Sequence, residues 1–224
     1  MIEQKSSPAD APSGLRPARG AARCAVVALA LAGAAWTVRA VWHIRLAVAG
    51  EPASGPPDQG GGVHRPLNAL EDSYHLVASA GGAVTVVCAI VFLSWLDRVR
   101  DNAKALSGEA PRYGYGWLWL GWIVPVANLW IPRGVVADVH RSVFPERRLP
   151  AVVNWWWGLW LAGLAGGVGI VYADDTDEVI ARAYHGVAPL LAADLVIVAA
   201  AGAAALMVHT LTTAQQEHIA AKGY

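Results

Sequence analysis

Two charged residues fall inside apolar stretches of the sequence, and they are the first candidates for chemistry. Arg39 lies ~24 Å into a long apolar run near the N-terminus, and Asp194 lies ~10 Å into another run near the C-terminus, at ~1.5 Å per helical residue. Because a charge inside a bilayer is costly, such residues usually pair or line a pathway. We expect an intramembrane Arg39–Asp194 ion pair. Snorkelling of Arg39 to the outer interface and a proton or ion pathway are the alternatives.

Three histidines, His43, His75 and His185, each lie within about a turn of a predicted helix end. Two neutral imidazoles can ligate a haem iron, and three can hold zinc. Each of these histidines lies on a separate segment, however, and no ligand spacing links them. We therefore expect ordinary interfacial histidines, with no metal and no cofactor.

The other reactive residue types favour a protein without catalytic activity. Cys24 and Cys88 lie inside apolar runs and are expected to be small buried hydrophobic residues. The acidic stretch 174–178 could bind calcium loosely, but a solvated loop is the expected structure. The sequence contains no Walker loop, dinucleotide glycine fingerprint, nucleophile elbow or His-Glu-x-x-His motif. We expect no enzymatic activity.

The distribution of apolar residues indicates a membrane protein. Of the 224 residues, 55% are hydrophobic and 15% charged, with a mean hydropathy of +0.38. The apolar residues form runs long enough to span ~30 Å of hydrocarbon. We predict an all-α membrane protein with one polytopic domain, residues 23–212. Its four transmembrane helices are expected at about 24–49, 76–95, 152–172 and 187–208, between a disordered tail (1–22) and a short polar tail (213–224). A signal peptide is the alternative for the first run.

The stretch 113–148 is expected to be a Trp/Pro-rich helical element on the cytoplasmic side. It is either re-entrant, entering the membrane and leaving on the same side, or interfacial. Pro125 removes a backbone donor in the middle of its apolar part, so we predict a bend near residues 125–128. Asn128 is expected to cap a half-helix there or to satisfy freed backbone groups. After Pro132, apolar residues alternate with charged ones at helical spacing, which predicts an amphipathic helix along the interface. The central motif comprises Trp122, Pro125, Asn128, Trp130 and Pro132.

Basic residues set the expected orientation, because Lys and Arg accumulate on the cytoplasmic side of short loops. Four lie in residues 1–23 and eight in residues 96–150, whereas the two remaining loops carry one each. This distribution predicts a multi-pass membrane protein with both termini in the cytoplasm. It also places a basic belt at the cytoplasmic surface, formed by Arg98, Arg100, Arg112, Arg133, Arg141, Arg147 and Arg148.

Three motifs resemble a known family. They are WLDRVRDNA at 95–103, GWIVPVANLWIP at 121–132 and NWWWGLW at 154–160. Together they resemble the actinobacterial membrane proteins catalogued as domain of unknown function 4328. The resemblance implies a multi-span architecture and a bacterial plasma membrane, and it implies no activity.

We therefore expect a non-enzymatic structural or interaction protein whose basic, Trp-rich cytoplasmic face contacts the lipid bilayer. Anionic lipid is the expected contact, with a protein partner or a homo-oligomer as further possibilities, and no nucleic acid is expected. A small oligomeric transporter or channel gated by the broken central helix is the first alternative. A membrane haem or redox protein is the second.

Overall fold

The computed structural model describes residues 14–165 and 176–223. Within these ranges the chain forms seven α-helices and one short 3-10 helix, and it contains no β-strand. The predicted all-helical class is therefore confirmed. Three of the helices are long and apolar enough to cross a membrane.

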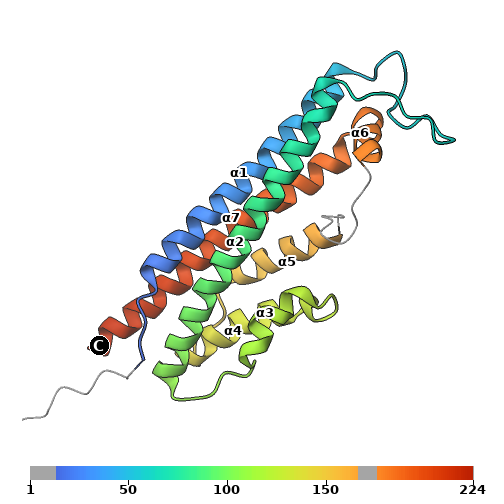
Figure 1. The fold of residues 1–224 in the computed structure, drawn as a ribbon. Coiled ribbons are helices and arrows are strands. Elements are labelled where there is room, and N and C mark those ends of the chain that lie inside the picture. The colour runs from blue at the N-terminus through green and yellow to red at the C-terminus, as the bar shows by residue number, and fades with distance from the viewer. Residues whose placement is uncertain (1–13, 166–175, 224) are drawn as a thin grey trace, which may run out of the picture.

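The three long helices form the body of the molecule (Figure 1). They are α1 (Arg19–Ala49), α2 (Ala69–Ser107) and α7 (Ala188–Ala221), and α1 packs along both of the others. The first residues of α1 and the last residues of α2 and α7 lie together at what we call the termini end. The opposite, loop end holds the end of α1 and the start of α2. At 39 residues and ~1.5 Å each, α2 exceeds the thickness of a bilayer.

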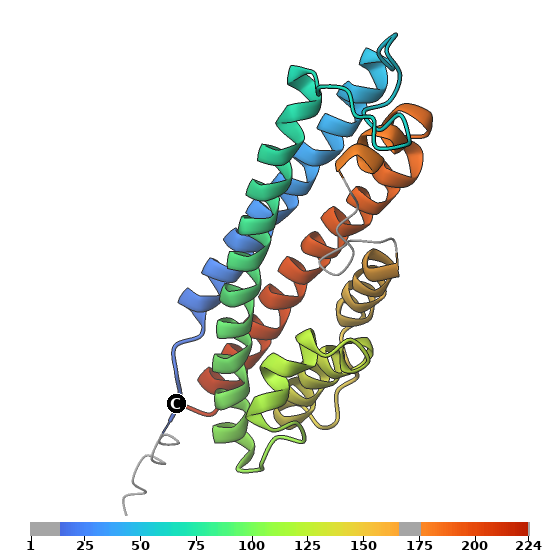
Figure 2. The same cartoon turned by 45° about the vertical axis from the view of Figure 1, so that its right-hand side comes forward.

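Two shorter helices pack on this body. Helix α5 (Ala151–Ala165) runs along α7, and α6 (Thr176–His185) lies at the loop end against α1, as Figure 2 shows. The predicted third span, 152–172, is only partly described, because residues 166–172 lie outside the described residues. So do Asp174 and Asp175 of the predicted acidic loop.

Helix α6 was not expected, since its residues were assigned to a loop. It has acidic residues in its first turn and basic ones in its last, an arrangement that favours a helix through its dipole. Its apolar face, Val179, Ile180 and Ala183, is buried. Two of these residues join Trp42 and Leu46 of α1 in a small core at the loop end. Packing against α1 therefore converts the predicted loop into a helix.

The hairpin, as we call residues 115–143, consists of α3 (Tyr115–Ile123), the 3-10 helix η1 (Ala127–Leu129) and α4 (Ile131–Val143). The break falls at the residues around Pro125, where the sequence predicts a bend. The helices on either side pack together closely, because Gly121 leaves no room for a side chain beside Ile131.

The amphipathic face of α4 is turned toward protein, which corrects the expectation that it lies against the membrane interface. Its four valines, at 135, 136, 139 and 143, are buried in the main core. They share that core with the apolar stripe of the distal half of α2, Leu96, Val99 and Ala103. Each of these two apolar stripes therefore covers the other.

Both predicted tails are shorter than expected. Residues 19–22 already belong to α1, and α7 continues to Ala221. The segment before α1 is held at the termini end by Asn102, which is buried. Its side chain accepts a hydrogen bond from the Arg16 backbone N–H (2.7 Å) and donates one to the Arg16 carbonyl (2.9 Å). This double contact orders a polar segment that has no periodicity of its own. Residues 1–13 lie outside the described residues.

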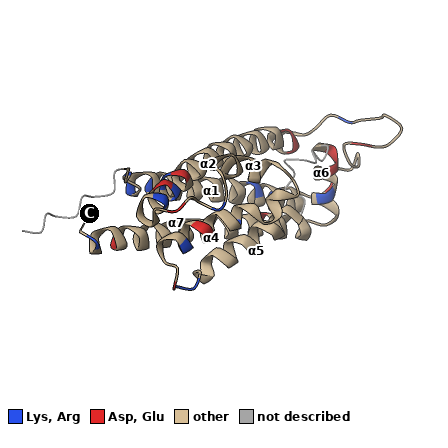
Figure 3. Cartoon of the chain, turned by 90° about the horizontal axis from the view of Figure 1, so that it is seen from below, with Lys and Arg blue, Asp and Glu red and all other residues tan. Residues whose placement is uncertain are grey.

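Charged residues gather toward the two ends of the bundle, and its middle is mostly uncharged (Figure 3). This distribution fits a body whose central part is surrounded by hydrocarbon.

A glycine substitution tests the close packing of the hairpin. A Cβ added at Gly121 would lie 2.6 Å from Cγ2 of Ile131, which is buried, whereas one at Gly158 in α5 meets nothing within 4 Å. We expect Gly121→Ala to destabilise the hairpin by about 1–3 kcal/mol through overpacking. Gly158→Ala is expected to be neutral or to stabilise by up to about 1 kcal/mol through helix propensity. Thermal unfolding of both variants in detergent provides the comparison. Equal stability of the two would contradict the close contact.

Candidate functional site

The structure brings the two predicted intramembrane charges together. Arg39 of α1 donates to Asp194 of α7: its Nη2 lies 2.7 Å and its Nε 2.9 Å from the same carboxylate oxygen, Oδ1. The Asp194 side chain is fully buried, whereas that of Arg39 is 23% exposed. The guanidinium also stacks 4.2 Å above the ring of Trp36. Arg39 is therefore held from two sides, by a carboxylate and by an aromatic face.

A third residue completes this cluster. His43 Nδ1 lies 2.9 Å from the second carboxylate oxygen of Asp194, Oδ2, and the imidazole is 1% exposed. The other ring nitrogen, Nε2, is buried and has no hydrogen-bond partner among the described residues. We refer to Arg39, His43 and Asp194 as the charge cluster. The sequence placed His43 near the same level of the bundle but did not connect it with Asp194.

Helical spacing explains why these groups meet. Arg39 and His43 are four residues apart on α1, so they lie on one face a turn apart. Asp194 lies in the second turn of α7, which begins at the same end of the bundle. The two helices approach closely below the cluster, where the Cβ of Ala201 would be 3.7 Å from a Cβ at Gly33. Small residues at a helix interface permit such an approach.

The histidines do not form a ligand set. His75 is exposed on α2, and His185 Nδ1 lies 2.8 Å from the Ala181 carbonyl one turn earlier on α6. In residues 14–165 and 176–223, no group of three or more His, Cys, Asp or Glu side chains is arranged to hold a metal ion.

A second buried network ties the loop end together. Glu71 lies in the first turn of α2, before the apolar segment 76–95, and is fully buried. Its carboxylate accepts two hydrogen bonds from Arg65, at 2.7 and 2.8 Å, and one from the Tyr184 hydroxyl of α6 at 2.6 Å. It also completes a capping box with Asn68. One carboxylate thus joins the loop before α2, the start of α2 and α6.

The hydrogen bonds and the burial of this network shift the pKa values of Glu71 and Tyr184. The hydrogen bonds from Arg65, with those of Tyr184 and Asn68, lower the pKa of Glu71 to about 2. Burial, together with the hydrogen bond to Glu71, raises the pKa of Tyr184 to about 12. The carboxylate is therefore ionised and the phenol neutral across the physiological range. Glu71 was not among the predicted site residues, and the Asn68–Glu71 spacing of a capping box is the sequence signal that could have identified it.

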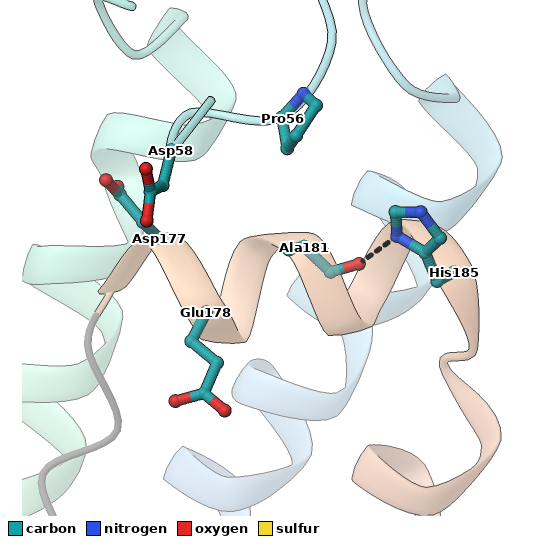
Figure 4. A pocket seen from close by; sticks show the side chains of 6 residues that line it. All are labelled: Pro56, Asp58, Asp177, Glu178, Ala181 and His185. Carbon is teal, nitrogen blue, oxygen red and sulfur yellow. Dashed lines mark hydrogen bonds between the residues drawn. The ribbon is translucent and has the colours of Figure 1, made fainter. Parts of the chain in front are cut away.

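Beside this network lies a shallow acidic pocket of about 390 Å³ between α6 and the loop that precedes α2. Figure 4 shows Asp58 beside Asp177 at the start of α6, while Glu178 points away from both. Asp177 is already bonded by His64, at 3.1 Å, from the same loop. The pocket therefore belongs to the contacts that hold the loop against α6.

The central motif supplies an aromatic core between the hairpin and its neighbours. The ring of Trp122 lies 5.6 Å from those of Phe92 and Trp160 and 6.1 Å from that of Trp156. Trp160 donates to the side-chain oxygen of Asn128 at 3.3 Å. The expectation that Asn128 caps a half-helix is wrong, because neither η1 nor α4 has a side-chain cap.

The other members of the motif lie at the break and beside it. Pro125 lies in the exposed turn before η1, and Pro132 opens the first turn of α4. Trp130 points its side chain outward, with 55% of its surface exposed.

The basic belt is divided between structural and exposed members. Arg100 donates to the Tyr113 carbonyl at 2.8 Å, and Arg133 binds the Asn154 side chain at 2.6 Å. Arg98 reaches the Pro17 carbonyl at 3.5 Å, and Arg112 stacks on its neighbour Tyr113. Three exposed members cluster near the end of α4: Arg141, Arg147, which stacks on Phe144, and Arg148.

Residues 66–213, more than half of the chain, match the family model described as "Domain of unknown function (DUF4328)". The chain belongs to this family. The resemblance drawn from the three motifs is thereby confirmed, and all three lie within the match. The match begins at residue 66, so α1 lies outside it. Asp194 therefore falls inside the family region, and Arg39 and His43 fall outside it. No curated protein and no solved structure matches the chain.

The ion pair of the charge cluster is tested by removing one partner and then both. Asp194→Asn leaves the Arg39 cation without its counter-charge and is expected to lower the free energy of unfolding by about 3 kcal/mol. In Arg39→Met/Asp194→Leu no charge remains, so most of that loss is expected to be recovered. Thermal unfolding in detergent reports both effects. A double variant that is as unstable as Asp194→Asn would contradict a compensated ion pair.

Proposed function

We propose that this chain is a four-span plasma-membrane protein with both termini in the cytoplasm. We further propose that its hairpin enters the cytoplasmic leaflet, where it binds anionic lipid. Its role is non-enzymatic: the protein interacts with the bilayer surface through the hairpin and the basic belt. The observation that carries this proposal is the exposed apolar surface of the hairpin.

That surface is too apolar to face water. In the hairpin, Ile123 is 74% exposed and Val126 63%. Trp155, at the start of α5, is 70% exposed beside it. Exposed patches of this kind mark membrane or protein contacts. Tryptophan prefers the level of the lipid headgroups, which fits a hairpin that enters one leaflet only.

Positive charge lies at the C-terminal end of the hairpin, at the opposite end of α4 from the apolar turn. Arg141, Arg147 and Arg148 are exposed there. A basic residue near an anionic leaflet contributes about 1 kcal/mol to membrane attachment. Apolar insertion and electrostatic attraction together favour a bilayer rich in anionic lipid over a neutral one.

The course of the chain supports a fourth crossing. Helix α5 follows the hairpin and runs along α7 toward the loop end. The chain is next described at the loop end, in α6. A crossing between the two would agree with the distribution of Lys and Arg, which places the hairpin and both termini on one side.

Cysteine accessibility in intact cells tests this topology. In a background with both native cysteines replaced by alanine, single cysteines are introduced at the loop end, at Ser54 and Gly186. Others are introduced at Glu109, Glu146 and Glu217, which are exposed on the proposed cytoplasmic side. A membrane-impermeant thiol reagent is expected to label only the first two. Labelling at Glu146 without labelling at Glu109 would mean that the hairpin crosses the membrane.

Lipid retention tests the proposed contact. The variant Arg141→Glu/Arg147→Glu/Arg148→Glu reverses the exposed end of the basic belt. We expect it to retain severalfold less phosphatidylglycerol than the wild type after purification in mild detergent. Arg45→Glu, an exposed position near the loop end of α1, is the matched control and is expected to retain the wild-type amount. Unchanged unfolding temperatures would show that both variants are folded, and equal lipid retention in the two would refute the proposal.

A further inference from the structure

The charge cluster contains one anion and two groups that can be cations. Asp194 accepts hydrogen bonds from Arg39 on one carboxylate oxygen and meets His43 on the other. With a neutral imidazole the cluster has no net charge, which suits a buried site. With a protonated imidazole it carries one positive charge, and a single carboxylate cannot fully neutralise both partners.

The cluster has one place where a proton can be added without breaking an existing bond. His43 uses Nδ1 toward Asp194, and its Nε2 is buried without a hydrogen-bond partner among the described residues. A buried unpaired nitrogen of this kind is uncommon, because buried polar groups are nearly always satisfied. The lone pair of Nε2 is therefore the proton acceptor of the cluster.

Arg39 and His43 differ in how readily each side chain can move away from Asp194. His43 is 1% exposed and is fixed between α1 and α7. Arg39 is 23% exposed and has a long side chain that is already stacked on Trp36. A guanidinium can extend toward the membrane surface while its aliphatic part stays in contact with apolar groups. Arg39 is thus the partner that Asp194 can release.

Other ionisable groups near this end are engaged elsewhere or lie on its surface. From α2 and α6, Glu71 is bonded to Arg65 and Tyr184, and His185 to its own helix. The Trp42 ring, next to His43, packs against Tyr74 of α2. Arg45 of α1 and His75 of α2 are exposed. No carboxylate other than Asp194 bonds to His43 in the described residues.

We propose that Arg39, His43 and Asp194 form a proton-binding site in which one proton, taken up at His43 Nε2, exchanges the partner of Asp194 from Arg39 to the imidazolium. No covalent bond other than the new N–H changes. The ion pair Arg39–Asp194 is replaced by the ion pair His43–Asp194, and the released guanidinium carries the added charge toward the outer interface. The new N–H requires an acceptor, so water must enter the α1–α7 contact when the proton binds.

The protonation state of His43 in the full-length protein tests this inference. The protein, labelled with ¹⁵N-histidine and reconstituted in lipid nanodiscs, is followed by ¹⁵N NMR from about pH 8 to about pH 5, the range in which histidines titrate. The signal absent from His43→Asn identifies the residue. We expect a neutral imidazole with its proton on Nδ1 at the alkaline limit and reversible conversion to imidazolium on acidification.

Matched variants separate partner exchange from a fixed structural contact. Arg39→Gln removes the competing cation, so at about pH 6 the protonated fraction of His43 is expected to rise severalfold. Arg39→Lys keeps a competing cation and is the second variant should Arg39→Gln not fold. Asp194→Asn removes the anion, and His43 is then expected to stay neutral. Arg45→Gln, an exposed arginine on the same helix, is expected to behave as the wild type.

Two results would overturn the inference. One is a His43 that stays in a single protonation state over the whole range in the wild type. The other is a protonated fraction that does not respond to removal of the Arg39 charge. Neither result depends on lipid binding by the hairpin, so this site and the proposed function stand or fall separately.

Discussion

Polar groups in the apolar part of the bundle must find their partners within the protein, and the carboxylate of Asp194 is where this constraint acts most strongly. It is fully buried, and within the described part of the chain its hydrogen-bond and ion-pair partners, Arg39 and His43, both lie on α1. A charged residue that could not be hydrated thereby fixes how α7 lies against the first helix. The close approach at Gly33 and Ala201 continues the same contact.

Buried polar side chains also hold the two ends of the bundle. At the loop end the Glu71 carboxylate joins Arg65, Tyr184 and the start of α2. At the termini end the buried amide of Asn102 holds the backbone of Arg16. Each network has one buried polar side chain that connects segments far apart in the sequence. Between them, packing is almost entirely apolar.

The hairpin differs from the bundle in what covers its two surfaces. Its inner surface is a core of valines and aromatic rings shared with α2 and α5, whereas its outer surface is apolar and uncovered. A segment that is apolar on both sides, broken at Pro125 and followed by exposed arginines suits the boundary between hydrocarbon and headgroups. The proposed lipid contact and the proposed proton site thus lie in different parts of the protein and arise from different physical causes.

Local pattern was sufficient for several features of this protein. The long apolar runs predicted the bundle helices, and Pro125 predicted the break in the hairpin. The three Trp-rich motifs identified the family. Each of these features depends on residues close together in the chain, so periodicity, length and backbone chemistry could be read directly. Arg39 and Asp194 could be singled out as well, because a charged residue inside an apolar run is evident from the sequence alone.

Tertiary structure alone decided three other features. His43 joins Arg39 and Asp194, Glu71 is buried, and the stripe of α4 covers α2 rather than lipid. These outcomes depend on which helices become neighbours, and neighbours far apart in sequence are chosen by the packing of the whole chain.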